Sequence, residues 1–484
     1  MSAANATQGR RTAPPGGPRK PPQSNAEQLS ADERLARGKR ARAEVPRSSH
    51  AVWEPPANRT SPVDLLERQA KTRVPELVPI RHGRMLVSPF TYYRGAALPM
   101  ASDLATTPSS GLHAQICGDA HLSNFGVFGS PERHLFFDVN DFDETAPGPW
   151  EWDVKRLAAS LEIAGRDNGF PGKERKSIVR RAVRSYRETM REFARISMLE
   201  VWYAHLDMDE LLPRFHSSLD RKQTPGVWKA IAKARAHDSV QAFAKLAEVV
   251  NGECRILHQP PLIMPVEELV EGVDPVLEAM DTIIGSYRAT LRHDRRRLLE
   301  QYRFVHLARK VVGVGSVGTQ AWILLLLDDQ GLPLFLQVKE AEASVLEEFT
   351  SECEFSNHGQ RVVAGQRQMQ AASDIFLGWE RFAWEDDERD YYVRQLRDWK
   401  GSADIAGMTQ TGMELWGRMC GWTLARAHAR SGDRVAIGAY LGKSDAFDRA
   451  IGSFSVAYAD QNERDHEALN EAVKSGRLAA DVGL

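Results

Sequence analysis

Helical periodicity covers much of the chain. Apolar residues recur at steps of three and four over residues 150–194 and 412–430, which is the spacing that buries one face of a helix. Ser61-Pro62 predicts a helix start, since serine caps helices and proline suits the first turn. Further helical patterns lie at 196–300, 341–372 and 444–474.

Short apolar runs bounded by turn residues predict strands. Residues 112–117 suit a buried strand, and residues 124–128 and 134–143 flank a Gly-Ser-Pro-Glu-Arg turn, so they predict a β-hairpin. Farther along, antiparallel strands are expected within 304–340, at 374–379 and at 391–397. Helices and strands together predict an α+β fold.

Residues 79–100 are expected to be irregular with one strand. They contain three arginines at intervals, Arg81, Arg84 and Arg94. Such a cluster either contacts phosphate groups or forms ion pairs at the surface, and the sequence leaves both readings open.

Length and composition indicate the number of domains and predict a terminal tail. The chain has 484 residues, is 42% hydrophobic and carries a net charge of −2, so two or three domains with a sizeable core are expected. Residues 1–60 are rich in Arg, Lys, Pro, Gly and Ser and poor in large apolar side chains. They predict a disordered basic tail, more a solvated linker than an arm that binds nucleic acid.

Several function classes are not expected. No apolar stretch approaches the ~20 residues that cross a membrane, and no charged start followed by an apolar run marks a secretory signal. The four cysteines are far apart, so neither a zinc site nor a disulfide framework is predicted. Basic and aromatic residues do not interleave as in single-strand nucleic-acid binders. We expect a cytoplasmic protein without a membrane or nucleic-acid partner.

Acidic residues gather around the predicted hairpin. Asp119 and Asn124 have the spacing D-x-x-x-x-N, and Asp138, Asp141 and Asp143 follow on the apolar strand and just after it. Neighbouring carboxylates cost free energy unless a cation or proton offsets them. An asparagine oxygen beside them suits Mg²⁺. This spacing is typical of the catalytic and metal loops of phosphoryl-transfer enzymes.

A glycine triplet, Gly313, Gly315 and Gly318, lies between two predicted strands. A dinucleotide-binding fingerprint would lead from a strand into a helix, so the pattern favours the kinase loop whose backbone amides approach phosphates. Ser316 and Thr319 can add hydroxyl donors. Lys339 follows on the next strand, where a solvent-facing lysine is the alternative to one that neutralises the α- and β-phosphates.

These parts resemble the protein-kinase-like superfamily. Residues 304–400 resemble its small lobe in order, with the hinge at 395–400. The loop from Gly118 to Asn124 resembles the H-G-D-x-H-x-x-N loop of aminoglycoside and choline kinases, except that Cys117 stands in place of the first His. Residues 139–143 resemble the I-D-F-D segment that follows that loop.

The order of these parts implies a circular permutation. The catalytic loop precedes the nucleotide lobe, and Leu424-Ala-Arg-Ala-His428 resembles the end of the helix that normally comes before that loop. One cut between that helix and the loop explains the order, and termini tolerate such cuts when they are close. The resemblance implies a two-lobed fold in four segments. They are a tail at 1–60, a mainly helical large lobe at 61–300, a small antiparallel-sheet nucleotide lobe at 301–400 and helices returning to the large lobe at 401–484.

The resemblance also implies the cofactors ATP and Mg²⁺ and transfer of a phosphate to a hydroxyl of an unidentified small molecule or protein. Asp119 would be the catalytic residue and Asn124 and Asp141 the metal ligands, with Asp138 and Asp143 competing for that role. Asp153 would brace the catalytic loop, and His121 would either orient Asp119 or pack. The glycines, Ser316 and Lys339 would bind the nucleotide.

One expected part is missing. A kinase pairs its strand lysine with a Glu on the following helix, yet residues 358–372 contain no Glu; Glu348, Glu352 and Glu354 lie earlier. A nucleotide-binding module without transfer, or nucleotidyl transfer, is therefore the alternative.

From about residue 45 onward the chain further resembles a bacterial family, domain-of-unknown-function family 2252, which is grouped with kinase-like proteins and implies no substrate. The runs that carry this resemblance are Val45-Pro-Arg47, Tyr93-Arg-Gly95, Gly118-Asp-Ala-His121, Asn140-Asp-Phe-Asp-Glu144 and Arg394-Gln-Leu-Arg-Asp398.

Overall fold

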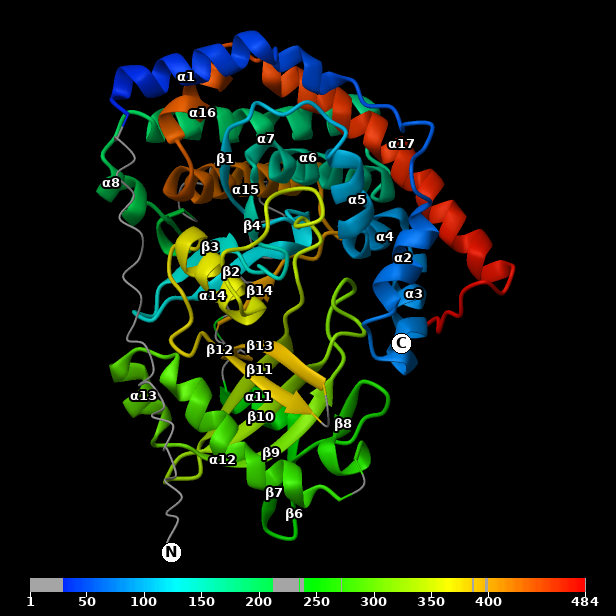
Figure 1. The fold of residues 1–484 in the computed structure, drawn as a ribbon, viewed down its shortest axis with the longest axis vertical. Coiled ribbons are helices and arrows are strands. Elements are labelled where there is room, and N and C mark those ends of the chain that lie inside the picture. The colour runs from blue at the N-terminus through cyan, green and yellow to red at the C-terminus, as the bar shows by residue number, and fades with distance from the viewer. Residues whose placement is uncertain are drawn as a thin grey trace, which may run out of the picture.

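Helices and sheets occupy different ends of the molecule in the computed structural model (Figure 1), which describes residues 29–211, 235, 239–270, 272–384, 387–396 and 399–483. Most helices gather at one end, and a six-stranded sheet with its own helices forms the other. The predicted α+β class, with small antiparallel sheets, is confirmed. None of the described helices is long and apolar enough to span a bilayer.

The six-stranded sheet is antiparallel and has the order β12-β13-β11-β10-β9-β8. Its strands are β8 (Ile263–Pro265), β9 (Arg303–Lys310), β10 (Ala321–Leu327), β11 (Pro333–Glu340), β12 (Gly378–Trp384) and β13 (Asp387–Gln395). The strands predicted within 304–340 are confirmed. The strand expected at 374–379 begins only at Gly378.

Every residue of β10 is buried because helices cover both faces of this central strand. Leu324 and Leu326 pack in one apolar cluster with Ile284 of α12 (Asp274–Ala289). Ile323 and Leu325 pack in another with residues of α11 (Ser239–Leu246). Side chains alternate between the faces of a strand, so a strand buried on both faces needs a continuous apolar run rather than an alternating one.

The helical end is built around α6 (Trp150–Asp167), α7 (Gly172–Phe193) and α15 (Gln410–Ser431), which confirm the predicted helical periodicity. At Gly421 of α15 an added Cβ atom would lie 2.3 Å from the Ala182 carbonyl oxygen of α7, so the two backbones can approach this closely only through glycine. Further helices outside the sheet region include α2 (Pro62–Ala70), α8 (Met198–Tyr203), α16 (Arg434–Leu441) and α17 (Ala446–Lys474), whereas α13 (His293–Leu299) lies near the six-stranded sheet.

The predicted hairpin is present and lies between the two ends. It pairs β2 (Phe125–Gly129) with β3 (Leu135–Val139) in a sheet of order β14-β2-β3-β5, where β14 is Gly401–Ser402 and β5 is Leu206–Asp207. Separately, β1 (His113–Ile116) pairs with β4 (Ala146–Pro149). The acidic loops therefore leave from the ends of β1 and β3.

Residues 79–100 contain helices instead of the predicted irregular segment with a strand. They form α3 (Val78–Leu86), α4 (Pro89–Gly95) and α5 (Ala97–Leu104). The Ser88 hydroxyl accepts a hydrogen bond from the Thr91 amide, and Pro89 occupies the first turn of α4. This is the same serine–proline start that predicts α2, so the signal was present in the sequence.

The predicted tail is too long. Residues 31–44 form α1 (Ala31–Glu44), which Ser30 and Glu33 start with a capping box, and α1 packs against α16. Downstream, Trp53 is buried against Tyr458. Residues 1–28 lie outside the described part of the chain.

Two predicted helices are shorter than expected. In 341–372, only α14 (His358–Met369) is helical, because Glu144 binds the Val345 amide and the Ser344 hydroxyl and holds the preceding segment away from helical geometry. In 196–300, the structure contains β5 and β8 and a hairpin of β6 (Ala247–Val250) with β7 (Glu253–Ile256). Residues 212–234 of that region lie outside the described part.

A buried histidine should make the fold sensitive to acid. His50 is 1% exposed. The Tyr440 hydroxyl donates to the Val45 carbonyl, so His50 Nε2–H donates to Tyr440 at 2.7 Å and Nδ1 has no partner. Burial, with a smaller effect of Lys155, lowers the pKa of His50 to about 3. The unfolded histidine binds a proton near pH 6.5, so stability is lost as pH falls below that value, by about 2 kcal/mol at pH 5.

This loss is measured by urea unfolding of the wild type and of His50→Phe at pH 7.5 and 5.0. The variant, which cannot titrate here, should show a pH dependence smaller by about 2 kcal/mol. Equal pH dependence in both proteins would contradict the burial of a neutral His50.

Candidate functional site

A cleft of about 780 Å³ lies where the loops after β1 and β3 meet the loop between β9 and β10. Most residues that the sequence predicted for the site line it. They are Asp119, Asn124, Asp141, Asp143, Gly313, Gly315 and Ser316. Gly318 and Lys339 do not line the cleft. Lys339 contacts Asp143, which does line it.

Lys339 on β11 and Asp143 after β3 form an ion pair across the two parts of the fold. Lys339 Nζ donates to Asp143 Oδ2 at 2.5 Å, and the Tyr392 hydroxyl donates to Asp143 Oδ1 at 2.5 Å. Burial alone would raise the pKa of Asp143, but Lys339 and Tyr392 hold it below its usual range. Asp143 is therefore the counter-ion of the strand lysine, a role that the sequence sought among Glu348, Glu352 and Glu354.

Asp141 has the freer carboxylate. It accepts a hydrogen bond from the Asp143 amide at 3.2 Å, and no ion pair joins it to another residue in the described ranges. Burial, followed by the charge of Asp143, raises the pKa of Asp141. A carboxylate under such like-charge pressure gains most from a cation, which agrees with the choice of Asp141 as the first metal ligand.

Asp138 is not available as a metal ligand. Its two oxygens accept hydrogen bonds from Arg426 Nη2 at 2.8 and 2.7 Å, and the pair is 1% exposed on both sides. The amides of Val139 and Ala371 donate to the same carboxylate. Asp138 thus ties the hairpin to α15.

Removing this carboxylate should destabilise the fold without affecting ligand binding. Asp138→Ala leaves Arg426 buried and without its counter-ion, which costs about 3–5 kcal/mol. Chemical unfolding measures this loss. Arg181→Ala, which breaks an ion pair with Glu414 in which Arg181 is 56% exposed, is the control and should cost less than about 1 kcal/mol. Similar losses in the two variants would contradict the structural role of Asp138.

Asp153 of α6 fixes the loop that carries Asp119, as the sequence predicted. Its Oδ2 accepts from the Cys117 amide at 2.8 Å and its Oδ1 from the Gly118 amide at 2.9 Å. His428 at the end of α15 lies 3.1 Å from the same carboxylate through Nε2. Gly118 adopts a positive φ of 77°, which lets the chain turn before Asp119.

Asp119 is held by Arg156, a residue that sequence reasoning missed. Arg156 Nε donates to Asp119 Oδ1 at 2.5 Å, and the guanidinium stacks 4.5 Å from the Tyr93 ring centroid. Burial raises the pKa of Asp119 against the opposing charge of Arg156. His121 Nε2 lies 3.6 Å from Asp119 Oδ2, and burial lowers the pKa of His121 well below its usual value. A neutral His121 can therefore help orient Asp119.

One of the two polar side-chain atoms of Asn124, Oδ1, takes no part in the hydrogen bonding of its own loop. Its Nδ2 donates to the Asp119 carbonyl at 2.9 Å, which leaves Oδ1 as the atom able to bind a cation. The glycine loop touches the same acids, because Ser316 Oγ lies 3.3 Å from Asp143 Oδ2. Thr319, a second predicted hydroxyl donor, bonds instead to the Ser316 carbonyl at 2.9 Å.

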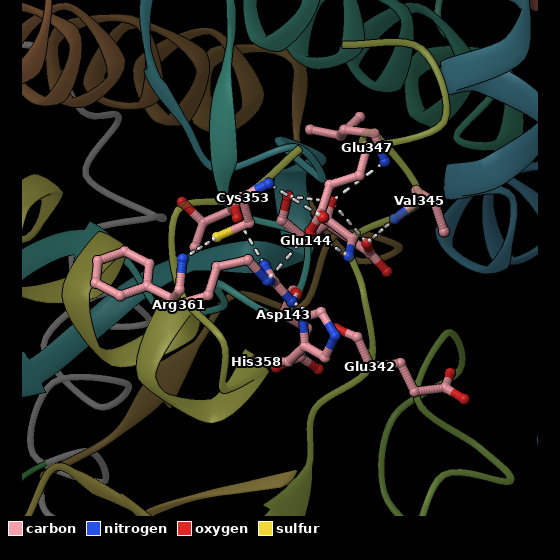
Figure 2. Close-up of polar contacts among 12 residues, drawn as sticks. Asp143, Glu144, Glu342, Val345, Glu347, Cys353, His358 and Arg361 are labelled. Carbon is pink, nitrogen blue, oxygen red and sulfur yellow. Dashed lines mark hydrogen bonds and ion pairs between the residues drawn. The ribbon is translucent and has the colours of Figure 1, made fainter. Parts of the chain in front are cut away.

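Arg361 of α14 occupies the position where the sequence sought a Glu, and Figure 2 shows its guanidinium pointing at the acidic loop. It donates to the carbonyl oxygens of Asp143 at 2.8 Å, Thr145 at 2.6 Å and Glu342 at 2.9 Å. One arginine thus joins the segment after β3 to the segment after β11. No periodicity or motif signals such a backbone contact.

The cleft is strongly acidic on this side. Glu144 lines it, and burial raises the pKa of Glu144 to about 7. Within the described ranges, no three acidic, histidine or cysteine side chains converge to hold a metal by themselves. A Mg²⁺ ion bound here would take oxygens from Asp141 and Asn124 and complete its shell with water or phosphate, as Mg²⁺ commonly does.

Fold and site together define an α+β protein with an acidic cleft between a helical part and an antiparallel sheet. The chain belongs to the family described as "Uncharacterized protein conserved in bacteria (DUF2252)", whose model matches residues 73–472. No curated protein and no solved structure matches the chain.

Residues 397 and 398 of the predicted hinge lie outside the described part of the chain. Within that hinge, burial lowers the pKa of Lys400 to about 7.

Proposed function

We propose that this protein transfers the γ-phosphate of ATP, with Mg²⁺, to a hydroxyl group of a small molecule or protein, on a circularly permuted protein-kinase-like fold. The observation that carries the proposal is the ion pair between Lys339 and Asp143, residues 196 positions apart in the chain. It joins the strand after the glycine loop to the acidic loop after the hairpin. In the proposed function these two segments would be the two halves of a site for a metal-bound nucleotide.

The place of α15 supports the permutation. Its end would lead directly into the catalytic loop in an unpermuted kinase. Here the Ser431 hydroxyl at that end accepts from the Gln115 amide of β1 at 3.1 Å, and His428 contacts Asp153, which braces the loop. The two chain segments that a single cut would have separated therefore lie side by side.

Each site residue then has a role in the transfer. Asp141 and Asn124 would hold Mg²⁺ against the phosphates, with Asp143 as a further candidate, and Lys339 would neutralise phosphate oxygens. Asp119 would accept the proton of the acceptor hydroxyl or hold that hydroxyl in line. Backbone amides of the glycine loop and the Ser316 hydroxyl would approach the phosphates.

One observation favours a second candidate, a module that binds nucleotide without transfer. Both oxygens of Asp143 are engaged by Lys339 and Tyr392, and Asp119 is engaged by Arg156. Kinases instead pair the lysine with a helix Glu and leave both aspartates for metal and acceptor.

A transfer screen distinguishes these functions. Purified protein is incubated with Mg²⁺, a metabolite and protein-extract library and either γ- or α-labelled ATP, in parallel with Asp119→Asn. Label from the γ-position in an acceptor, lost in the variant, supports phosphotransfer. Label from the α-position assigns nucleotidyl transfer. Nucleotide binding without label in any acceptor assigns the binding module.

A further inference from the structure

Three arginines line the same cleft as the acidic loops. Arg73 follows α2, Arg81 lies on α3 and Arg94 on α4. These three residues are called the arginine wall below. For Arg81 and Arg94 the sequence left open whether they meet phosphates or form surface ion pairs. Within the described ranges, no carboxylate lies within ion-pair distance of any of the three.

Two members of the arginine wall are buried, Arg94 is half-buried, and none of the three forms an ion pair within the described part of the chain. Arg73 is 7% exposed and Arg81 is 0% exposed. Arg81 Nη2 donates to Gln69 Oε1 at 2.6 Å and to the Gly95 carbonyl at 2.9 Å, and Arg73 donates to the Val317 carbonyl. All these acceptors are neutral. Arg81 Nε and Nη1, Arg73 Nε and Arg94 Nε have no hydrogen-bond partner among the residues that the structure describes.

A guanidinium stays protonated in proteins, so these groups are buried cations that retain unused donors. Burial lowers the pKa of all three arginines. Leaving such a charge without a counter-ion costs free energy, and an oxyanion supplies both the charge and the acceptors.

We propose that Arg73, Arg81 and Arg94 form a subsite for an oxyanion, a phosphate or carboxylate, carried by the acceptor substrate. The inference rests on the proposed phosphotransfer and adds that the acceptor is an anionic molecule. Arg94 and Asp119, the proposed catalytic residue, line the same cleft, and the charge of Arg94 acts on Asp119; this pairing favours the acceptor as the carrier of the oxyanion. Arg73 in turn is influenced by Glu342, Glu144 and Asp143.

The glycine loop lies against the arginine wall. An added Cβ atom at Gly315 would lie 3.0 Å from the Arg94 carbonyl, and one at Gly318 would lie 3.0 Å from the Arg73 side chain. The Val74 amide also donates to the Gly318 carbonyl at 2.8 Å. Because the loop lies against the wall, the terminal phosphate of ATP is the other possible source of the oxyanion.

The test measures binding of inorganic phosphate by calorimetry, at constant ionic strength, to the wild type and to Arg94→Gln. Arg94 is suited to substitution because it is half-buried and its Nε is unpartnered. Arg68→Gln is the matched control, since Arg68 lines the same cleft but already pairs with Glu348 at 2.7 Å. Phosphate affinity should fall about tenfold or more in Arg94→Gln and change little in Arg68→Gln.

The same titration in saturating Mg²⁺ and a non-hydrolysable ATP analogue distinguishes the two sources. Phosphate that still binds the wild type with similar affinity supports the acceptor subsite. Phosphate that is excluded by the analogue, together with weaker binding of the analogue but not of ADP to Arg94→Gln, assigns the wall to the terminal phosphate and overturns the acceptor role. Equal phosphate affinity in wild type and Arg94→Gln overturns the subsite itself.

Failure of the proposed function gives a different result from failure of the oxyanion subsite. A wild type that binds neither ADP nor the analogue refutes the nucleotide site. The oxyanion site would still stand in that case if Arg94→Gln alone lost phosphate binding.

Discussion

Lys339→Met should lower the free energy of unfolding by about 3 kcal/mol and abolish measurable binding of Mg-ATP. The substitution leaves Asp143 without its counter-ion, and about 3 kcal/mol is the lower end of the cost of breaking a buried ion pair. The lower end applies because the Asp143 side chain is 28% exposed and keeps its hydrogen bond from Tyr392. Chemical unfolding and calorimetric titration with Mg-ATP measure the two effects.

The double variant Lys339→Met/Asp143→Asn separates the loss of stability from the loss of Mg-ATP binding. It removes the unpaired charge, so it should recover most of the lost stability and still fail to bind Mg-ATP. If Lys339→Met binds Mg-ATP as tightly as the wild type does, Lys339 does not contact the nucleotide.

Asp119→Asn should slow phosphoryl transfer by roughly 10²–10⁴-fold while the dissociation constant of Mg-ADP changes by less than about threefold. The amide cannot accept the proton of the acceptor hydroxyl, and the proposed nucleotide contacts lie on Lys339, Asp141 and the glycine loop. Initial rates with the acceptor found in the transfer screen measure the first effect, and calorimetry the second.

Asp119→Asn needs a folding control. The substitution removes the charge of Asp119, so Arg156 loses its counter-ion. Retained Mg-ADP binding shows that the cleft survives. A variant that binds Mg-ADP normally and transfers phosphate at the wild-type rate would remove Asp119 from the chemistry.

Much of the fold follows from local pattern. The run Trp322–Leu327 is apolar at every position because β10 is covered on both faces, and the hairpin follows from the turn between two apolar runs. At 79–100 the structure has helices where irregular chain is expected, and Ser88-Pro89 is the local signal for one of them. At 341–357 the segment is held by a contact that is distant in sequence, since Glu144 accepts hydrogen bonds from the Val345 amide and the Ser344 hydroxyl.

The sequence predicts which residue types form the site, but it predicts less well which of these residues contact each other. The spacing around Asp119 and Asn124 and the glycine triplet identified residues that do line one cleft. The sequence could not show that Asp143 serves as the counter-ion of Lys339, or that Arg361 binds three carbonyl oxygens, since both depend on contacts between segments far apart in the chain.

Buried arginines are a second feature whose role is hard to predict from the sequence. Arg156 and Arg73 look in sequence like ordinary surface residues, because charged side chains are rarely buried unpaired. For Arg81 the sequence leaves a phosphate contact and a surface ion pair equally open. The structure shows that Arg73 and Arg81 line the cleft and that Arg156 binds the cleft residue Asp119.

The central claim is that one cleft binds a metal-bound nucleotide between the glycine loop and Asp141. A crystal structure of the protein with Mn²⁺ and a non-hydrolysable ATP analogue, with data collected for the anomalous signal of manganese, tests it most directly. The account predicts an anomalous peak beside Asp141 and Asn124 Oδ1, with the phosphates between the glycine loop and Lys339. A nucleotide bound elsewhere, or a cleft with neither metal nor phosphate at saturating ligand, would contradict it.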